Sequence, residues 1–444
     1  MLALAPAGRG ASAATARVSG TGAVHREPIP SFSRQTGLRC GQCHTTFPQL
    51  TPFGRRFKLN GYTLTGLRMI EAEDTSERPL KLDLIPPVSA MLQASITHTG
   101  KAQSGAVNGG VEFPQALSIF LGEAITPRVG TFLQLTYEAS SGALAVDNAD
   151  IRYANHGRLG SREVIYGATL NNNPTVQDVW NGVPAWRFPF ATSSVAPTPG
   201  VALLADGALA QRVAGLGAYA LWDNRVYGEF SVYRSAFQGG HHPPDSSATG
   251  VLRHVAPYWR AAWQHGSRRQ YLQLGTYGMS ARLYPRGVGG VTDRYTDVGL
   301  DAQYERRVGS ARRARPGEQG GTEGHVTAHA SWTGEWQRLD ASFAAGRSAN
   351  LRNSLHDLRI DASYYAPSRV GFTLAYFSVT GSVDDSLYAA YGARRPDSDG
   401  VIGELDFLPW LNARFTLQYI AYGKFNGSRT GDNNTLYLLT WLVF

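Results

Sequence analysis

Long apolar runs are missing from this sequence, and cysteine is limited to one close pair. No run of about 18 apolar residues occurs, which excludes a transmembrane helix. The two cysteines, Cys40 and Cys43, lie too close together to form a disulfide framework for a chain of 444 residues. No nucleic-acid-binding motif accompanies the net charge of +8, whose densest basic patch is the ARRAR run at 311–315. We therefore expect no nucleic acid among the partners.

Glycine and aromatic residues, by contrast, are abundant. The chain contains 50 Gly and 21 Tyr, with 43% hydrophobic and 11% aromatic residues, so it is not a disordered chain. This composition suits a membrane β-barrel, and it suits a large soluble all-β protein equally well. The pattern along the chain has to separate these two classes.

From about residue 87 onward, segments of about ten residues alternate in polarity, as in strands that face lipid on one side. In 129–138, one face carries Val129, Thr131, Leu133, Leu135 and Tyr137. The other face carries Gly130, Phe132, Gln134, Thr136 and Glu138. We expect the first face to meet lipid and the second to meet a polar lumen.

The connections between these segments alternate between long and short. Long connections are expected at 99–113, 171–202, 239–250, 284–293, 346–354, 382–397 and 425–434, with a further loop near 140–146. Tight turns are expected at 126–128, 156–161, 223–224, 266–267, 367–368 and 409–410, whereas the link at 309–322 is long where a short turn is due. With 203–222 counted as one tilted strand, the pattern predicts about 16 strands, an even number typical of outer-membrane barrels.

The chain ends in a strand with apolar or β-branched residues on alternate positions and a terminal Phe444. Bacterial barrels commonly finish in this way, and the alternative is the last strand of a soluble sheet. Together with the loop alternation, this end favours an all-β protein with an antiparallel transmembrane barrel. The barrel should be closed, because an open edge would leave unpaired amides in lipid.

Cys40-Gly41-Gln42-Cys43-His44 has the C-x-x-C-H pattern of covalent haem attachment. The two thiols can reach the two vinyl groups of one porphyrin edge, and His44 then lies under the iron as the proximal ligand. A structural zinc site would need four ligands, and no second Cys pair exists. A thioredoxin-like dithiol would need a βαβ setting, which is absent, and a plain disulfide remains an alternative.

A short helix should follow this motif, capped by Thr51, started by Pro52 and ended at Gly61. We expect an apolar haem wall formed by Phe47, Leu50, Phe53 and Phe57, although a small core would use the same residues. Arg55, Arg56 and Lys58 are candidates for pairing with the haem propionates, with a solvated helix face as the alternative. The expected haem domain is therefore small and α-helical.

Two further sets of metal ligands follow from residue type alone. The candidates for the sixth haem ligand are His25, Met69, Met91 and His98, and an open or water-bound position is the alternative. His241, His242 and Asp245 cluster in one expected external loop and are candidate contacts for iron. A solvated polar loop explains these three residues as well.

The N-terminal residues resemble the end of a signal peptide. Residues 1–7 are apolar, and 11–13 and 14–16 resemble small-residue cleavage sites, but a basic n-region is missing. We expect Met1 to lie inside a longer signal peptide. The predicted organisation is a signal-peptide-like segment at 1–16, a monohaem cytochrome c domain at 17–79 and an outer-membrane barrel at 80–444.

Two stretches around the motif carry a family resemblance: PSFSRQTGLRCGQCH at 30–44 and FPQLTPFGRRFKLNGY at 47–62. NNPTVQDVWN at 172–181 and PAWRFP at 184–189 extend it into the expected long loop. They resemble the fused cytochrome–porin outer-membrane iron oxidases, a monohaem c-type cytochrome joined to a β-barrel. The resemblance implies one haem c, extracellular Fe(II) as substrate, outer-membrane lipid around the barrel and a periplasmic c-type cytochrome or other soluble carrier as acceptor. Of the family's functional residues, only Cys40, Cys43 and His44 are carried over.

Three functions follow as expectations. The first is an iron:cytochrome c type oxidoreductase in the outer membrane, with the haem domain in the lumen or on the periplasmic side, because electron tunnelling falls steeply with distance. The second is a diffusion porin whose haem-bearing plug gates or senses. The third is electron exchange with a different extracellular donor or acceptor.

Overall fold

The computed structural model describes residues 31–65, 88–139, 141–236, 242–267, 269–287, 289–309 and 323–444. Residues 31–65, called the plug below, contain three short helices and a two-stranded sheet. These elements are α1 (Ser31–Thr36), α2 (Cys40–Cys43), β1 (His44–Thr46), β2 (Gln49–Leu50) and α3 (Pro52–Leu59). The predicted domain boundaries at 16/17 and 79/80 lie outside the described residues, as do His25 and Met69.

The rest of the described chain is an antiparallel barrel of 16 strands, which confirms the predicted fold class. The first seven strands are β3 (Val88–Thr99), β4 (Val111–Thr126), β5 (Val129–Glu138), β6 (Ala143–Leu159), β7 (Arg162–Asn171), β8 (Val213–Trp222) and β9 (Val226–Ser235). The other nine are β11 (Ala256–Gly266), β12 (Gln270–Tyr284), β13 (Asp293–Val308), β14 (Gly324–Arg338), β15 (Arg352–Tyr365), β16 (Val370–Gly381), β17 (Ser398–Trp410), β18 (Ala413–Lys424) and β19 (Thr435–Val443).

The barrel is closed, because β9 pairs with β11 and the last strand, β19, pairs with the first, β3. The two-residue strand β10 (Val251–Leu252) pairs with β12 above this ring. The loops also contain α4 (Asp340–Ala344) and short turns of helix at η1 (Pro184–Trp186), η2 (Leu204–Ala208) and η3 (Ala389–Tyr391). None of the described helices is long and apolar enough to cross a membrane.

The outer surface of the barrel is apolar. In β16, Val370, Phe372, Leu374 and Tyr376 are exposed, whereas the residues between them face inward. In β5 the cavity described below is lined by Phe132, Gln134, Thr136 and Glu138, so the predicted inward face is confirmed for these residues. An apolar exterior on a closed antiparallel barrel with short turns at one end is the architecture of a bacterial outer-membrane protein.

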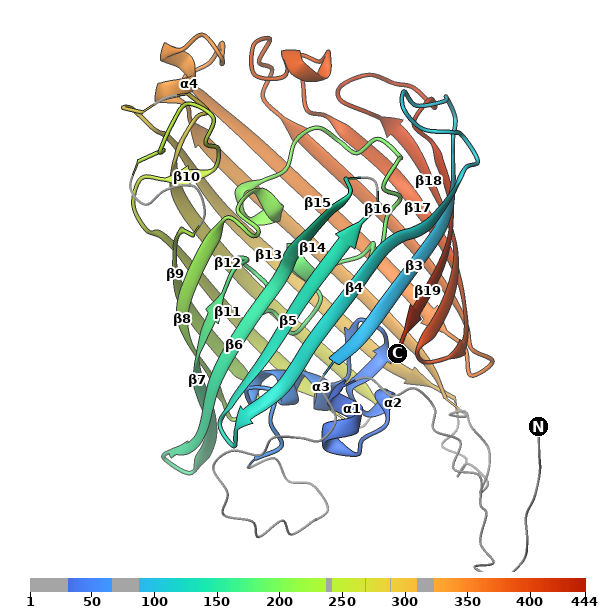
Figure 1. The fold of residues 1–444 in the computed structure, drawn as a ribbon. Coiled ribbons are helices and arrows are strands. Elements are labelled where there is room, and N and C mark those ends of the chain that lie inside the picture. Colours follow the sequence, from blue (N-terminus) through green and yellow to red (C-terminus); the bar gives the residue numbers. More distant parts are fainter. Residues whose placement is uncertain are drawn as a thin grey trace, which may run out of the picture.

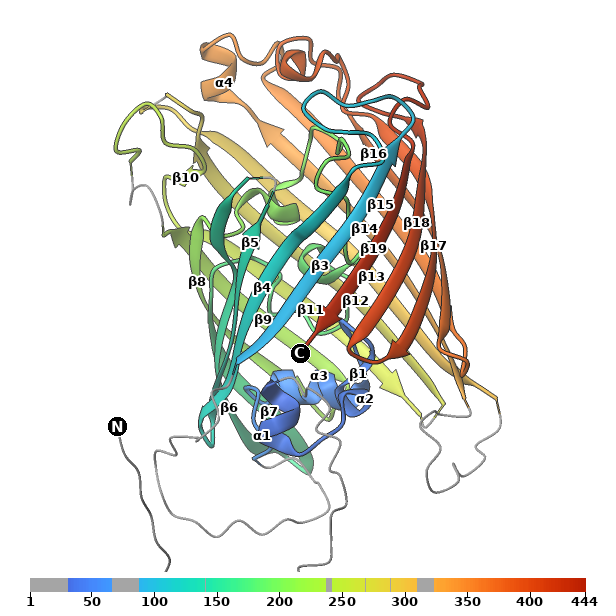
Figure 2. The same ribbon diagram turned by 45° about the vertical axis from the view of Figure 1, so that its right-hand side comes forward.

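The long loops lie at one end of the barrel and the short turns at the other, with the plug inside the short-turn end (Figures 1 and 2). In outer-membrane barrels the short turns face the periplasm. The strand prediction was wrong at 203–212, which is not part of a strand, because β8 begins only at Val213. The connection from β7 to β8 therefore covers residues 172–212, called the lumen loop below. The strand prediction was also wrong at 143–146 and 156–159, expected as loop and turn, because both belong to β6.

Candidate cofactor site

The C-x-x-C-H motif lies in the plug, at the periplasmic end of the barrel (Figure 2). Cys40 and Cys43 are the first and last residues of α2 and are not joined by a disulfide, so the plain-disulfide alternative is not the state of this structure. His44 follows as the first residue of β1. The middle of α2, Gly41 and Gln42, is exposed to solvent.

The predicted helix after the motif is present as α3. Thr51 caps it, since its hydroxyl accepts a hydrogen bond from the Gly54 amide at 3.1 Å, and Pro52 is its first residue. Gly61 has φ +69°, the left-handed conformation that ends a helix and that glycine adopts without strain. Gly54 lets α3 approach α2, because a Cβ there would stand 2.1 Å from the Cys43 carbonyl oxygen.

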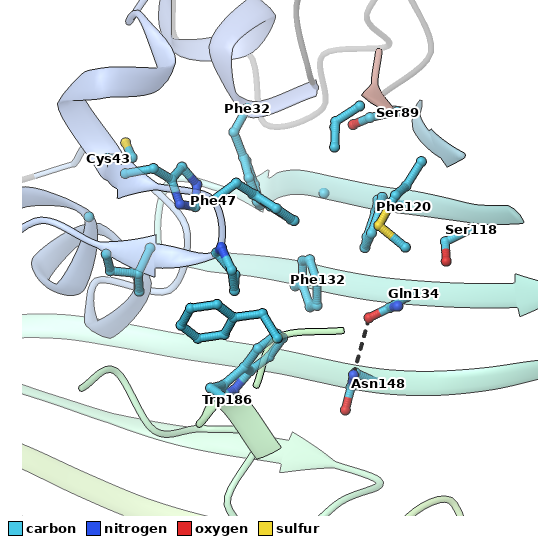
Figure 3. A pocket seen from close by; sticks show the side chains of 18 of the residues that line it. Phe32, Cys43, Phe47, Ser89, Ser118, Phe120, Phe132, Gln134, Asn148 and Trp186 are labelled. Atoms are coloured by element: carbon cyan, nitrogen blue, oxygen red, sulfur yellow. Dashed lines mark hydrogen bonds between the residues drawn. The ribbon is translucent and has the colours of Figure 1, made fainter. Parts of the chain in front are cut away.

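One cavity of about 490 Å³ joins the plug to the barrel and to the lumen loop (Figure 3). The plug lines it with both cysteines, His44, Phe47, Leu50 and Phe57. The barrel contributes Met91, Phe120, Phe132, Trp441 and Val443, and the lumen loop contributes Trp186 and Phe190. The volume falls within the range of small-molecule and cofactor sites, about 300–1,000 Å³.

The histidine at this cavity has the properties of a metal ligand. Burial lowers the pKa of His44 to about 4, so the imidazole is neutral at ordinary pH. Its Nδ1 atom is buried and has no hydrogen-bond partner. Burial, and then the neighbouring Cys40, raise the pKa of the Cys43 thiol to about 11, so this thiol is protonated rather than reactive.

Two predictions about the surroundings need correction. Phe53 does not line the cavity, whereas Phe47, Leu50 and Phe57 do. Arg55 and Lys58 do not point to a free anion site. The Arg55 guanidinium pairs with Glu305 of β13 at 2.5 and 3.1 Å, and the Lys58 ammonium donates to the Val176 and Asp178 carbonyl oxygens, both at 2.7 Å.

Arg55 and Lys58 therefore hold the plug to β13 and to the lumen loop. The third predicted residue, Arg56, is partly exposed and lies 3.9 Å from Glu163. Two tyrosines add to the anchoring, because Tyr62 donates to Asp150 of β6 and Tyr219 of β8 donates to the Leu59 carbonyl oxygen, both at 2.6 Å. The plug is therefore held to strands on several sides of the barrel.

The structure places the candidates for the sixth haem ligand at different positions relative to the cavity. Met91 is buried on the inner face of β3 and lines the cavity, whereas His98 lies on the exposed outer face of the same strand. His25 and Met69 lie outside the described residues. The sixth ligand therefore stays a prediction, with Met91 the candidate that lines the cavity in the described part of the chain.

The far end of the cavity is polar and lies on β4, β5 and β6, nearer the long loops. Gln134 donates to Asp147 at 3.2 Å and accepts from Asn148 at 3.1 Å, the latter drawn in Figure 3. Ser118 and Thr136 share a hydrogen bond of 2.6 Å beside them. The cavity thus changes from aromatic near the cysteines to amide, hydroxyl and carboxylate groups toward the extracellular side.

In the described part of the external loop suggested as an iron contact, Asp245 and His242 are engaged with neighbours other than each other. Asp245 accepts hydrogen bonds from Ser247 in its own loop, and His242 shares one with Tyr284 at 3.1 Å. His241 lies outside the described residues. Within the ranges that the structure describes, no three His, Cys, Asp or Glu side chains gather as metal ligands would.

Sequence reasoning missed the residues that hold the lumen loop. Arg260 of β11 pairs with Asp301 of β13 at 2.8 and 3.0 Å and with Asp178 of the loop at 3.1 Å. Arg187 of the loop pairs with Asp357 of β15 at 2.8 Å and with Asp206. The sequence carried a partial signal, since alternation places Arg260 and Asp301 on inward positions, but nothing in it identifies their partners.

Comparison with known proteins finds solved structures of similar fold but assigns the chain to no family. No family model matches the chain, and no curated relative matches it. Among solved structures, OmpF of Salmonella typhi has a TM-score of 0.46 at 10% identity over 80% of this chain and 97% of that chain. The outer membrane channel DcaP of Acinetobacter baumannii has a TM-score of 0.45 at 10% identity over 80% and 96%.

A loop-deletion mutant of OmpT, an outer membrane protein of Vibrio cholerae, has a TM-score of 0.43 at 11% identity over 80% and 98%. All three TM-scores are below 0.5. The assignment to outer-membrane barrels therefore rests on this chain's own strand count, closure and apolar exterior.

Proposed function

We propose that this protein is an outer-membrane electron conduit that oxidises extracellular Fe(II) and passes the electron through one c-type haem to periplasmic carriers. One observation carries the proposal: Cys40, Cys43 and His44 line an apolar cavity inside a barrel that spans the membrane. Cys40 and Cys43 would hold the haem through thioether bonds, and His44 would be its proximal ligand. When bound, the haem supplies a one-electron iron couple.

The residues around the cavity suit this cofactor. The neutral His44 imidazole has an unpartnered nitrogen, as a ligand to iron requires. Phe47, Phe132 and Trp441 form an apolar wall that excludes water, which is one of the protein's means of setting a redox potential. The fused cytochrome–porin resemblance at 30–44 and 47–62 covers the attachment site and Phe47 of this wall.

The two ends of the site suit the two sides of the membrane. Toward the periplasm, α2 exposes Gly41 and Gln42 where a soluble carrier can approach. Toward the outside, Gln134, Asp147 and Asn148 give the cavity a polar end that a small hydrated cation can approach. Fe(II) would give up one electron on that side, the Fe(III) product would stay outside, and an oxidised periplasmic carrier would accept the electron.

A porin whose haem-bearing plug gates or senses is the second candidate, because a 16-stranded barrel ordinarily encloses an aqueous channel. Here the lumen loop crosses from β7 to the opposite wall, where Asp178 and Arg187 are ion-paired. The plug occupies the periplasmic end (Figure 1). Both features predict low solute flux and so favour the conduit.

The decisive variant is Cys43→Ala in the full-length protein, purified in detergent. We expect the barrel to fold, as judged by heat-modifiable mobility on gels, but to lose haem absorbance and the reduction of haem on mixing with Fe(II). Phe53→Leu is the matched control, since Phe53 is in the plug but not at the cavity, and it should keep both signals.

Two results would count against the proposal. Iron oxidation by Cys43→Ala at the wild-type rate would remove the haem from the reaction. Fast solute flux in liposomes, combined with a wild-type haem that Fe(II) does not reduce, would favour the porin. The remaining alternative is electron exchange with another extracellular partner, and a redox titration of the haem tests it. A midpoint potential far below that of the iron couple would exclude Fe(II) as the donor.

A further inference from the structure

The periplasmic end of the barrel carries exposed arginines in its short turns, at the ends of its strands and on the plug. Four arginines of this end that have no carboxylate partner among the described residues are called the basic ring below; they are Arg39, Arg128, Arg158 and Arg307. Arg39 directly precedes α2 in the plug, and the others come from β4–β5, β6 and β13. The basic ring therefore joins one residue next to the cysteine helix to residues from three segments of the barrel at the same end.

Within the part of the chain that the structure describes, the carboxylates beside these turns pair with other arginines and not with the basic ring. Asp223 lies 3.2 Å from Arg162 and 3.7 Å from Arg225, so one carboxylate serves two guanidinium groups. Glu163 and Glu323 each lie 3.9 Å from an arginine of their own, Arg56 and Arg269. Glu123 of β4 stands apart, three residues before the β4–β5 turn.

The exposed surface at and beside α2, at the same end of the barrel, is small and partly apolar. Gly41 and Gln42 of α2 are exposed, and Leu411 in the β17–β18 turn lies against α2, since a Cβ at Gly41 would be 3.4 Å from the Leu411 Cδ1 atom. Leu411 is 44% exposed and also lines the cofactor cavity. An exposed apolar residue at the edge of the cofactor cavity, on the same end of the barrel as several like charges, favours a brief encounter steered by charge.

We propose that the basic ring and the exposed face of α2 form the docking surface for a soluble electron carrier with an acidic face. The proposal deepens the conduit function by giving the chemistry of its periplasmic partner, and it rests on that function. The contact would be small, as in weak electron-transfer complexes, so charge complementarity rather than buried area would select the partner.

Anionic lipid is the competing ligand for exposed arginines on a barrel rim. Arg306 suits lipid, because it lies on the outward side of β13, where Asp301, Gln303 and Glu305 take the inward positions. Arg39 is in the plug, inside the ring of strands, and Arg158 continues the inward side of β6 after Asp150, Arg152 and Ala154. These two arginines lie on the plug and on the inward side of a strand rather than on the lipid-facing side, so they favour a soluble partner.

The test uses the full-length haem-loaded protein in nanodiscs of zwitterionic lipid. The probes are a soluble c-type cytochrome with an acidic surface and a basic one of similar size, with binding measured by microscale thermophoresis at several salt concentrations. We expect the acidic probe to bind with an affinity that falls as salt rises. The double variant R39E/R158E should bind it roughly tenfold more weakly or worse, and R306E is the matched control.

Unaltered binding in R39E/R158E, or equal binding of the basic probe, would overturn the proposal. So would a loss with R306E as large as that with R39E/R158E, because rim charge in general rather than the basic ring would then bind the probe. Probe binding that disappears when anionic lipid is added to the nanodiscs would also overturn the proposal, because that result assigns the arginines to the bilayer. Heat-modifiable mobility and an unchanged haem spectrum show that each variant is folded. Reduction of the haem by Fe(II) is measured separately. If the probe fails to bind but Fe(II) still reduces the haem, only the docking proposal is contradicted. If the probe binds but Fe(II) does not reduce the haem, the conduit function is contradicted.

Discussion

The inner wall of the barrel has two sides with opposite chemistry. On β19 and β3–β5, the residues facing the plug are Trp441, Met91, Phe120 and Phe132, and they leave a cavity between them. On β11–β15, the inward face carries buried charged residues among apolar ones such as Tyr258, Tyr277 and Met279. The charged side is represented by Arg260, Asp301, Asp297, Glu335 and Asp357.

The lumen loop contacts both sides with matching residues. It presents Trp186 and Phe190 to the aromatic side, and it presents Asp178 and Arg187 to the charged side. A polar lumen is the ordinary interior of such a barrel, so the aromatic side is the departure that needs a reason. We infer that the charged side holds the loop in place, whereas the aromatic side leaves room for a large apolar group.

The largest effect is expected on the charged side, from Arg260→Ala. Its removal leaves Asp178 and Asp301 as buried carboxylates without their cation, which typically costs about 3–5 kcal/mol. We expect a matching drop in the free energy of unfolding, and higher conductance in planar bilayers as the lumen loop loses its anchor.

The control for this variant is Arg162→Ala, whose partner Asp223 is also shared with Arg225 at the exposed rim. It should cost less than about 1 kcal/mol. If both arginines behaved alike, burial would not be what distinguishes the charged side.

On the aromatic side, Gly130→Ala tests how closely the plug approaches the wall. A Cβ at Gly130 would stand 2.1 Å from the Gly61 carbonyl oxygen, so backbone would have to move and the plug could not seat fully. We expect a loss of up to about 3 kcal/mol and faster proteolysis within 31–65. Gly228→Ala is the control, because nothing lies within 4 Å of the new Cβ and the variant should match the wild type. If residues 31–65 of Gly130→Ala resisted proteolysis as in the wild type, the close approach of Gly61 to Gly130 would not be required for the plug to seat.

Sequence reasoning succeeded where the signal is local. Alternation and loop length predicted 16 strands, and Thr51, Pro52 and Gly61 predicted α3, because each depends on neighbours in the chain. It failed at 203–212, where the Leu204 and Ala205 amides donate to Glu335 and Asp297. These partners lie far along the chain, so an apolar stretch that looks like strand is held in the lumen as loop.

The same limit applies to the site. Cys40, Cys43 and His44 could be named from spacing, but Arg55 was assigned to a propionate from its charge alone. Its partner, Glu305, lies on β13 and could be found only from the docked plug. Likewise, Phe120, Phe132 and Trp441 are inward residues of three strands, and only closure of the barrel brings them around one cavity.

The smallest effect is expected from Asp384→Asn, which tests whether a buried charge in a loop stabilises the protein as the buried charges of the lumen do. Asp384, in the loop after β16, is buried and accepts hydrogen bonds from the Ser348 hydroxyl at 2.6 Å and the Ala349 and Leu387 amides at 2.8 and 2.9 Å. Burial alone would raise its pKa, but these hydrogen bonds outweigh burial and hold the pKa well below its usual range. Asp384→Asn should therefore destabilise the loop by about 1.5 kcal/mol at pH 7.

The pH dependence gives this prediction its sign. Because the folded-state pKa is depressed, the stabilisation from Asp384 is fully present above the unfolded value of about 4 and is lost as pH falls toward the folded value. Hydrogen exchange in residues 339–351 should show wild type and Asp384→Asn converging below pH 4. Asp385→Asn is the control, since Asp385 is exposed and pairs with the exposed Arg394, so its loss should change little. A gap between wild type and Asp384→Asn that stayed constant down to pH 2 would show that the carboxylate's charge does not hold the loops, and that burial of charge matters only within the lumen.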